Sequence, residues 1–346
     1  MAGTFRFSFG PWNIHEGADP FGPPVRESIA FGKKLEEYKK LGFDAVQFHD
    51  DDAVPNMNDL SSEEVTREAD AVRKKLDGHG LAAEFVAPRL WEDPRTIDGA
   101  YTANDAACRE YARERSRRAI DIANALDTRL IVLWLAREGT YVREAKDSKV
   151  AADRLVEAVN DMLEYDKNIR IAIEPKPNEP MDQAYIPTTG HALALASRTV
   201  DPGRVGVNIE SAHAILAGLD PSDEMGFALS FGKLYTVHLN DQNGLKFDED
   251  KTFGAVDLRR ALNQVRLLDR YNYGGNGEWV GLDVKAMRTQ KADVATKHLS
   301  NSRENFLALL EISRSLDDKR IEAFVAERNY EELERYIVNV LIGRKG

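Results

Sequence analysis

Short apolar stretches alternate with longer amphipathic segments along most of the chain. The apolar stretches are rich in β-branched and aromatic residues, as strands buried on both faces of a parallel sheet are. The pattern predicts eight strands, at 5–12, 45–49, 82–87, 129–135, 169–174, 205–210, 234–239 and 279–284. Each strand is followed by a segment of helical periodicity, at 29–41, 62–79, 104–126, 149–166, 189–199, 222–232, 256–269 and 300–315. This alternation predicts βαβ units and therefore an α/β protein with a parallel sheet.

Eight consecutive βα units are compatible with a closed (β/α)8 barrel or with an open, doubly wound sheet. A dinucleotide-binding sheet of the second kind carries a G-x-G-x-x-G run after its first strand, and that run is absent here. We therefore predict a (β/α)8 TIM barrel over residues 1–316, with the open sheet as the alternative. Residues 317–346 are charged and helical in pattern, so we expect a short helical C-terminal extension outside the barrel.

Composition and charge narrow the class of protein. With 346 residues, of which 42% are hydrophobic, the chain can bury a large core and is not of the disordered type. The net charge of −11 argues against a nucleic-acid partner, because such a partner needs a basic stripe. The apolar runs are too short to cross a bilayer, and no signal-like start is present, so we expect no membrane association. The single cysteine, Cys108, cannot form an internal disulfide, which favours a cytoplasmic protein.

Ligand-type side chains gather where the predicted strands end, which is where TIM barrels carry their chemistry. These residues are Glu174, Glu210, His213, His238, Asp248, Asp250 and Asp283. An oxygen-rich set with two imidazoles suits Mg²⁺, Mn²⁺ or Co²⁺ better than a thiolate-bound structural zinc. The set is too large for one ion, so we expect two divalent ions that share Glu210. Lys176 would offset the negative charge that remains.

Each of these residues also has a purely structural interpretation. Glu174 could form a salt bridge with Lys176 at the barrel rim, and a lone buried histidine such as His238 is often a hydrogen-bonded core residue. Asp248 and Asp250 could belong to a solvated acidic turn. The concentration of all these residue types at one end of the predicted barrel favours the metal site.

A second candidate group combines a histidine with aromatic residues. His49 ends the second predicted strand, and Asp52 follows three residues later. A carboxylate on one ring nitrogen fixes the imidazole tautomer and leaves the other nitrogen free as a base. The structural alternative is an acidic, helix-capping turn beside a structural histidine. Trp12, Trp91 and Trp134 fall at or just beyond strand ends, where they would exclude water and stack on a sugar.

The ordered motifs that contain these residues resemble the xylose isomerase family, the metal-dependent aldose–ketose isomerases. The most specific motif is A-I-E-P-K-P-N-E-P at 172–180. The others are F-G-P-W at 9–12, D-P-F-G at 19–22, F-H-D-D-D at 48–52, Y-T-A-N-D at 101–105, R-E-G at 137–139, T-G-H-A-L-A at 189–194, N-I-E-S-A-H at 208–213, L-N-D-Q-N-G at 239–244, K-F-D-E-D at 246–250 and D-V-K-A-M-R-T at 283–289. They keep the family's order across residues 5–315.

The resemblance implies roles for individual residues. A first metal would be held by Glu174, Glu210, His238 and Asp283, and a second, catalytic metal by Glu210, His213, Asp248 and Asp250. Lys176 would hydrogen-bond the sugar carbonyl, His49 with Asp52 would assist ring opening, and Trp12, Trp91 and Trp134 would wall the sugar. Phe21 matches the aromatic residue that the family projects into a neighbouring subunit, which implies a homo-oligomer, either a tetramer or a dimer.

The reaction implied by the resemblance is sugar ring opening followed by a metal-assisted 1,2-hydride shift. The first candidate substrate is D-xylose, which would give D-xylulose, and the next is D-glucose, which would give D-fructose. Physically, a hydride shift needs an electron-poor carbonyl and a stabilised alkoxide, which cations in a dry pocket supply.

Departures from the family pattern keep other functions open. His238 stands where the family usually has an aspartate, which weakens the preference for Mg²⁺ and is also typical of related isomerases and ketose epimerases. Ala87, Pro88 and Arg89 replace small polar residues, and Trp91 replaces a phenylalanine, so the sugar-contacting wall differs. The C-terminal extension is also shorter than usual.

The main alternative is therefore another sugar isomerase or epimerase, or an enzyme that processes a sugar derivative on the same barrel. Its epimerase form, which uses paired glutamates and one metal, would not need His49, Lys176, Asp248 and Asp250. A non-catalytic sugar- or metal-binding scaffold is the minor alternative. It would have lost ligands, whereas every expected ligand position is filled.

Overall fold

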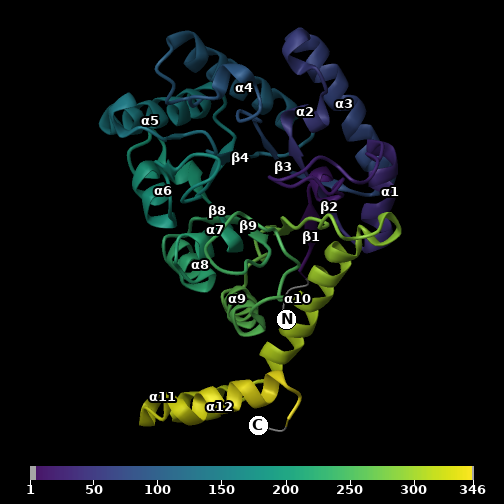
Figure 1. Cartoon of the computed structure of the whole chain (residues 1–346), viewed down its shortest axis with the longest axis vertical. Helices are drawn as coiled ribbons and strands as arrows, with labels where there is room; N and C mark the ends of the chain where they lie inside the picture. The colour runs from purple at the N-terminus through teal and green to yellow at the C-terminus, as the bar shows by residue number, and fades with distance from the viewer. Residues whose placement is uncertain (1–4, 345–346) are drawn as a thin grey trace.

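The computed structural model describes residues 5–344 and contains the closed eight-stranded barrel that the sequence predicts (Figure 1). Its parallel strands are β1 (Phe7–Phe9), β2 (Ala45–His49), β3 (Ala82–Ala87), β4 (Leu130–Trp134), β6 (Arg170–Glu174), β8 (Val205–Glu210), β9 (Leu234–Leu239) and β10 (Val280–Leu282). The strands follow chain order, and the barrel closes where β1 pairs with β10, from Phe7 opposite Val280 to Phe9 opposite Leu282. All eight carboxyl ends therefore open at one end of the barrel.

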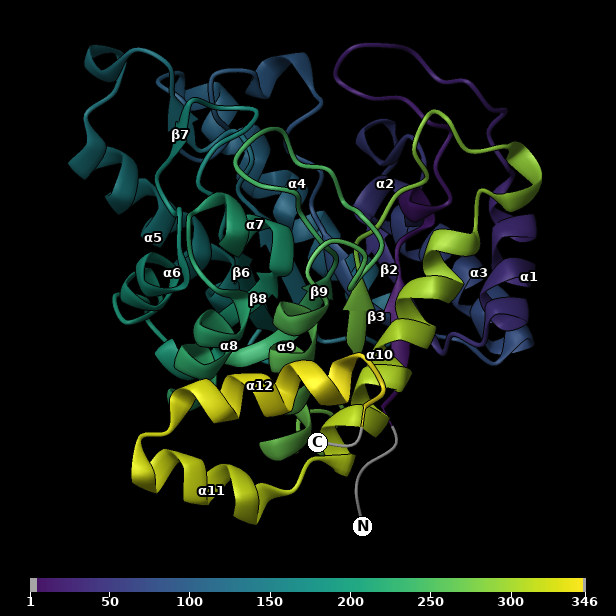
Figure 2. The same ribbon diagram turned by 60° about the horizontal axis from the view of Figure 1, so that its bottom comes forward.

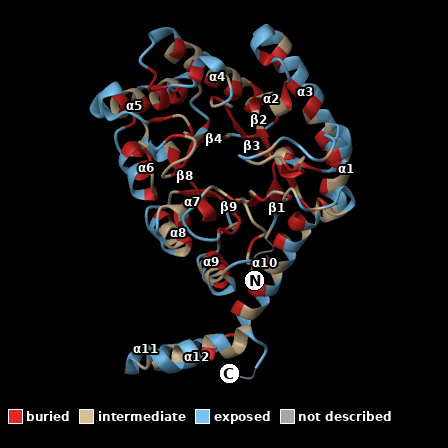
Figure 3. Ribbon diagram, in the orientation of Figure 1, coloured by how far each residue is buried: buried red, intermediate tan, exposed pale blue. Residues whose placement is uncertain are grey.

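Helices cover the outside of the barrel in the predicted order. They are α1 (Phe31–Leu41), α3 (Ser62–His79), α4 (Ala106–Ala125), α5 (Ser148–Tyr165), α6 (Thr189–Ala196), α8 (Pro221–Ser230), α9 (Leu258–Arg270) and α10 (Lys297–Ser315). In α3 the Ser61 hydroxyl accepts from the Glu64 backbone, and the Glu64 carboxylate accepts from the Ser61 backbone, which satisfies two free donors at the helix start. Figure 3 shows the buried residues along the strands and the inward faces of the helices, and the exposed residues on the outer faces.

The first and last barrel strands are shorter than predicted. Residues 5–12 were expected to be one strand, but β1 ends at Phe9 and a 3₁₀ turn follows at Pro11–Asn13. Proline has no N–H group for the sheet, and the Asn13 side chain accepts the Gly10 N–H at 2.8 Å, which stabilises the turn. The turn places Trp12 at the open end of the barrel, where it lines a pocket.

Three short features at the open end of the barrel were not predicted. Helix α2 (Asp50–Ala53) starts directly after β2, and α7 (Ser211–Leu216) starts directly after β8. A two-stranded antiparallel sheet, β5 (Gly139–Thr140) with β7 (Gln183–Ala184), joins the loops after β4 and β6. Segments of two to six residues are too short to show a period in the sequence, yet α2 and α7 carry candidate site residues.

The helical C-terminal extension is present as α11 (Asp318–Glu327) and α12 (Tyr330–Leu341). Figures 1 and 2 show these helices side by side, projecting from the barrel next to α9 and α10. Ion pairs tie them to α9, among them Arg266 to Asp318 at 2.5 Å and Arg259 to Glu334 at 2.7 Å. Within the described residues α11 buries no side chain and α12 buries only Tyr336. The division of the chain into domains at 316/317 stays a prediction.

The sequence also led to predictions about membrane association and about the single cysteine. Across residues 5–344, no helix combines the length and apolarity needed to cross a bilayer. Cys108 is buried in α4 and unpaired, in accord with a packing role.

Candidate active site

A cavity of about 470 Å³ opens at the carboxyl ends of the barrel strands. Phe85, Ala87 and Val132 of the barrel strands are among the apolar residues that line it. The lining also contains all seven predicted metal ligands, namely Glu174, Glu210, His213, His238, Asp248, Asp250 and Asp283. Lys176, His49, Trp12, Trp91 and Trp134 line the same cavity. The fold thus brings these predicted residues together from the ends of all eight barrel strands and the segments that follow them.

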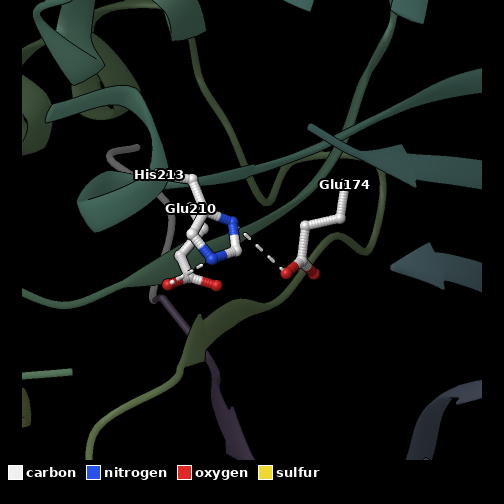
Figure 4. A group of neighbouring side chains, drawn as sticks. All are labelled: Glu174, Glu210 and His213. Carbon is white, nitrogen blue, oxygen red and sulfur yellow. Dashed lines mark ion pairs between the residues drawn. The ribbon is translucent and has the colours of Figure 1, made fainter. Parts of the chain in front are cut away.

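The backbone explains why the ligand-type side chains meet. Glu174 is the last residue of β6 and Glu210 the last residue of β8, and Glu210 lies in register opposite His238 of β9. Asp283 follows the last residue of β10. His213 lies in α7, one helical turn after Glu210, so both side chains point to the same place. Figure 4 shows Glu174, Glu210 and His213 converging.

The two histidines lie within ion-pair distance of several carboxylates. His213 Nε2 lies 3.3 Å from Glu210 Oε1 and 3.1 Å from Asp248 Oδ2, and His213 Nδ1 lies 3.6 Å from Glu174 Oε1. His238 Nδ1 lies 3.3 Å from Glu174 Oε2 and 3.8 Å from Glu210 Oε2. Both histidines are buried, so these distances define a compact polar cluster inside the barrel mouth.

In the part of the chain that the structure describes, three groups of side chains have ligand atoms within 4.8 Å of one another. They are Glu174 with Glu210 and His213, Glu210 with His238 and Asp283, and Glu210 with Asp248 and Asp250. Glu210 belongs to all three groups, as a residue shared between two ions would. This cluster, called the carboxylate–imidazole cluster below, comprises the seven predicted ligands.

Several buried atoms of the cluster lack hydrogen-bond partners among residues 5–344. They are His213 Nδ1, both ring nitrogens of His238, and Asp248 Oδ1. Leaving a buried polar atom unpaired costs about 1–3 kcal/mol, so such atoms normally serve a ligand or an ion. Carboxylate oxygens with a minority of imidazole nitrogens are the donors that hard and borderline divalent cations prefer. The residues present therefore fit divalent cations.

Mutual repulsion and burial shift the protonation of the cluster. Burial raises the pKa of Glu210 well above its usual range. Burial and the neighbouring Asp248 do the same to the pKa of Asp250. For His238 burial favours the neutral ring, but the negative charge of Glu174 outweighs it and raises the pKa well above 6.5. The cluster thus holds protons that a bound cation would displace.

Two lysines neutralise the remaining charge. Lys176 Nζ donates to Asp248 Oδ2 at 2.9 Å and lies 3.3 Å from Glu179 Oε2, so its partners are these carboxylates rather than Glu174. Burial alone would lower the pKa of Lys176, but Asp248 and Glu179 raise it, and Lys176 stays an ammonium. Lys285 Nζ donates to Asp250 Oδ2 at 2.8 Å. The sequence places Lys285 beside Asp283 at the end of the last strand but gave it no role, although its position two residues after a predicted ligand was a usable signal.

Amide side chains orient the glutamates of the cluster. Asn208 Nδ2 donates to Glu174 Oε2 at 2.5 Å, and Asn240 Nδ2 donates to Glu210 Oε1 at 2.8 Å. Asn240 Oδ1 accepts the backbone N–H of Ala212, which anchors the start of α7. The sequence reasoning missed both asparagines. Asn208 lies two residues before Glu210, and the period of two along a strand would have placed it on the same inward face.

Asp283, which follows β10, is hydrogen-bonded by two residues of the turn that follows β1. Asn13 Nδ2 donates to Asp283 Oδ1 at 2.7 Å, and Trp12 Nε1 donates to the same oxygen at 2.9 Å. His298 of α10 holds this arrangement in turn, since its Nε2 lies 2.8 Å from the backbone oxygen of Asn13. Trp12 therefore has a polar role beside its aromatic one.

Aromatic rings form a continuous wall on one side of the cavity. The ring centroids of Trp12 and His49 lie 4.1 Å apart, those of His49 and Trp91 5.1 Å, and those of Trp91 and Trp134 4.5 Å. Lys176 Nζ lies 5.1 Å from the Trp134 ring centroid, a cation–π distance. The structure thus places the three predicted tryptophans together beside the carboxylate–imidazole cluster.

Phe21 lies outside the cavity of its own chain. Its side chain is 82% exposed, and its ring packs edge-on against Phe247 at 5.8 Å. It belongs to the segment between Pro11–Asn13 and α1, seen as the long purple loop in Figure 2. Its contact with a neighbouring subunit stays a prediction.

The histidine–aspartate pair has the expected geometry and one further partner. Asp52 Oδ2 lies 2.9 Å from His49 Nδ1, and it also accepts the backbone N–H of His49 at 3.1 Å. Arg89 Nη2 donates to Asp52 Oδ1 at 3.0 Å and lies 2.6 Å from His49 Nδ1. Burial raises the pKa of Asp52, but His49 and Arg89 outweigh it and lower the pKa to about 2. Asp52 is therefore a carboxylate at neutral pH.

The fold is that of a TIM barrel, and the cavity at the carboxyl ends of its strands carries the ligand-type side chains. Comparison with known families then identifies the family of this barrel. A model of the family described as xylose isomerase-like TIM barrel matches residues 35–276. The chain belongs to this family, as the resemblance of its motifs implied.

Solved structures with the same fold share little sequence with this chain. A D-tagatose 3-epimerase-like protein is similar with a TM-score of 0.65 at 15% identity, over 89% of this chain and 98% of that one. D-psicose 3-epimerase from Clostridium cellulolyticum H10 gives 0.62 at 16% identity, over 90% and 98%. The IolI protein with a bound zinc atom gives 0.60 at 15% identity, over 90% and 100%. At this identity the likeness shows the fold.

Proposed function

We propose that this protein is a divalent-metal-dependent enzyme that interconverts isomers of a sugar. The carrying observation is the convergence of seven ligand-type side chains on one cavity that three tryptophans wall. The titles of similar structures support a sugar substrate, since they name D-tagatose, D-psicose and a 3-keto-D-glucoside. The zinc atom in the IolI structure supports a metal in this kind of barrel.

Two ions of Mg²⁺, Mn²⁺ or Co²⁺ would be held by the carboxylate–imidazole cluster. One would use Glu174, Glu210, His238 and Asp283, and the other Glu210, His213, Asp248 and Asp250. Bound divalent ions supply Lewis acidity, which polarises a sugar carbonyl and stabilises an alkoxide. The membership of Glu210 in all three groups supports sharing.

The remaining site residues would bind, orient and shield the sugar. Lys176 stays protonated and lines the cavity, so its Nζ would donate a hydrogen bond to the carbonyl oxygen. Trp12, Trp91 and Trp134 present apolar faces that exclude water and pack against the carbon-bound hydrogens of a sugar. His49, held by Asp52 and Arg89, faces the same cavity and would contact a sugar oxygen.

The first form of the reaction is aldose–ketose isomerisation, for example D-xylose to D-xylulose or D-glucose to D-fructose. The C2–H bond breaks, a C1–H bond forms with the same electron pair, and the proton of the C2 hydroxyl moves to the carbonyl oxygen at C1. The group of Glu210, Asp248 and Asp250 with the adjacent Lys176 supports this form. These residues would supply a second cation position and an ammonium close to the oxygens on C1 and C2, whose charge changes during the reaction.

The second form is epimerisation of a ketose, in which a proton leaves a carbon beside the carbonyl and returns to the other face. The epimerase structures that share this fold support it. The histidine at position 238 supports it as well, since the resemblance of the motifs associates a histidine there with ketose epimerases. Buried glutamates in the cavity, such as Glu174 and Glu210, would serve as bases.

One experiment tests the proposal and separates its two forms. The protein is stripped of metal, restored with Mg²⁺, Mn²⁺ or Co²⁺ in turn, and incubated with a panel of aldoses and ketoses in D₂O. Product without carbon-bound deuterium indicates a hydride shift, and deuterium in the product indicates proton abstraction. If no metal restores isomer formation from any pentose, hexose or deoxyhexose, the proposal fails.

The proposal extends to a homo-oligomer, dimer or tetramer, in a cytoplasmic setting. The exposed Phe21, which follows the cavity-lining Pro20, supports contact with a second copy. The single, unpaired Cys108 supports a reducing compartment.

A further inference from the structure

His49 Nδ1 has two close neighbours that make opposite demands on its proton. Asp52 Oδ2, at 2.9 Å, is a hydrogen-bond acceptor and would bond to a protonated Nδ1. Arg89 Nη2, at 2.6 Å, is a donor and would bond to an unprotonated Nδ1. A guanidinium has donors only and stays charged in proteins, so this second demand cannot be reversed by deprotonating the arginine. One of the two contacts must give way.

The carboxylate can give way because it is satisfied without the ring. Asp52 Oδ2 also accepts the backbone N–H of His49 at 3.1 Å, and Asp52 Oδ1 accepts from Arg89 Nη2 at 3.0 Å. The guanidinium is in the opposite position. If Nδ1 were protonated, its hydrogen and an Nη2 hydrogen would face each other across 2.6 Å. The unprotonated Nδ1 therefore satisfies more of this network.

Arg89 is held in place by groups that leave it little freedom. Its Nε lies 2.9 Å from Asp51 Oδ1, and its backbone N–H donates to Asp50 Oδ1 at 3.2 Å. Asp50 is fully buried and binds Arg115 of α4 through two hydrogen bonds of 2.7 Å each. Asp50 is the first residue of α2, directly after His49 at the end of β2, and the pair with Arg115 anchors it to α4. Through its bond to the Arg89 N–H, Asp50 thus joins the loop after β3 to the end of β2 that carries His49.

The other edge of the imidazole faces the cavity. His49 lines it between Trp12 and Trp91, and its Nε2 has no protein hydrogen-bond partner among residues 5–344. A neutral imidazole carries its proton on only one nitrogen. If Nδ1 accepts from Arg89, the proton is on Nε2 and points to where a sugar would bind.

We propose that Arg89 fixes His49 in the Nε2-protonated tautomer, so that His49 offers the sugar a hydrogen-bond donor and not a base. Arg89 acts as a positioning residue, through His49. The statement that the group bound is a sugar rests on the proposed function, whereas the tautomer does not. At this position the protonated Nε2 would favour a ligand that places an acceptor oxygen there, such as a carbonyl, ring ether or hydroxyl oxygen. An Nε2 that carries the proton has no lone pair with which to take the proton of an anomeric hydroxyl.

The tautomer is measured directly by long-range ¹H–¹⁵N correlation NMR on the full-length, ¹⁵N-labelled, metal-free protein at neutral pH. Loss of one set of signals in His49→Gln assigns the ring. We expect Nδ1 to show the shift of an unprotonated nitrogen and Nε2 that of a protonated one. A wild-type spectrum with the proton on Nδ1 overturns the proposal, and this result needs no variant of Arg89 to fold.

Variants then test whether Arg89 is the cause. In Arg89→Met the proton should move to Nδ1, where Asp52 accepts it, and in Arg89→Lys the wild-type tautomer should persist. Arg137→Met is the matched control, since Arg137 lines the same cavity but bonds to the backbone oxygen of Trp91 at 3.2 Å and not to His49. An unchanged tautomer in folded Arg89→Met overturns the role of Arg89. Because these measurements require no turnover, their outcome does not depend on whether the proposed reaction is correct.

Discussion

At the scale of single residues, Lys176 is a cavity residue whose positive charge is stabilised by its neighbours, because Asp248 and Glu179 raise its pKa. Its ammonium is buried, lies against the Trp134 face and bonds to Asp248. A permanent cation in a water-poor cavity stabilises a developing oxyanion more strongly than it would in water. The residue is therefore expected to act on the rate of the chemical step.

Lys176→Met is predicted to lower kcat by about 10²–10³-fold, the usual effect of removing one oxyanion donor. Methionine keeps the length of the side chain, so circular dichroism and the melting temperature should change little. Lys246→Met is the control, because Lys246 is exposed and pairs with Glu249 outside the main cavity. Wild-type kcat in Lys176→Met would remove Lys176 from the mechanism.

His298 is predicted to make the protein sensitive to acid. It is buried in α10, and burial lowers its pKa from 6.5 to about 4. The unfolded chain binds a proton below pH 6.5 that the folded protein resists, so stability falls as pH drops from 6.5 towards 4. The loss reaches about 3 kcal/mol at pH 4, at about 1.4 kcal/mol per pKa unit.

His298→Gln should lack this loss while keeping a donor for the Asn13 backbone oxygen. The measurement is urea unfolding at pH 7 and pH 4.5 for both proteins. The free energy of unfolding should drop further in the wild type than in the variant over this interval. Equal drops would show that His298 does not titrate in the way its burial implies.

At the scale of elements, short features at strand ends connect the site to the barrel. Asn240, just after β9, donates to Glu210 Oε1 and to the backbone oxygen of Asp283, and accepts from Ala212 at the start of α7. One side chain thus joins the ends of β8, β9 and β10. Groups that orient metal ligands typically contribute 10–100-fold to metal affinity.

Asn240→Ala is predicted to weaken Mn²⁺ binding by about 10–100-fold, as measured by titration calorimetry on metal-stripped protein. Asn263→Ala, at an exposed position of α9, is the matched control and should bind as the wild type does. Unchanged affinity in Asn240→Ala would show that Glu210 keeps its orientation without this contact.

At the scale of the whole molecule, the exposed Phe21 leads to a prediction about assembly. If Phe21 completes the cavity of a second copy, Phe21→Ala damages the cavity of the neighbouring subunit. Lys176→Met damages the cavity of its own subunit. Mixing the two inactive or weakened variants under conditions of subunit exchange should restore activity, because some hybrids contain one intact cavity. Light scattering should show an oligomer in each preparation.

The control for this mixing is Phe231→Ala, since Phe231 is also exposed but follows α8, away from the cavity lining. It should keep wild-type activity and need no partner. Monomeric protein, or hybrids with no gain in activity, would contradict action of Phe21 between subunits.

Much of the fold could be predicted because its signals are local. Buried parallel strands are runs of apolar residues, so all eight barrel strands were located, although the first was predicted to continue past Phe9 and the last past Leu282. The ligand-type residues were found because strand ends are recognisable in a barrel pattern. Asn208 and Asn240 were missed and Lys285 was left without a role, because the position of an amide or a lysine along a strand does not say which side chain it will contact.

The amino-acid sequence by itself determined the order of strands and helices, the end of the barrel that carries the chemistry, and the residue types available there. These follow from periodicity and from the rule that parallel strands share one carboxyl end. Tertiary structure alone decided that Glu210 belongs to all three ligand groups, that Lys176 pairs with Asp248, and that Arg89 reaches His49. Such contacts join residues tens of positions apart, and only closure of the barrel sets their distances.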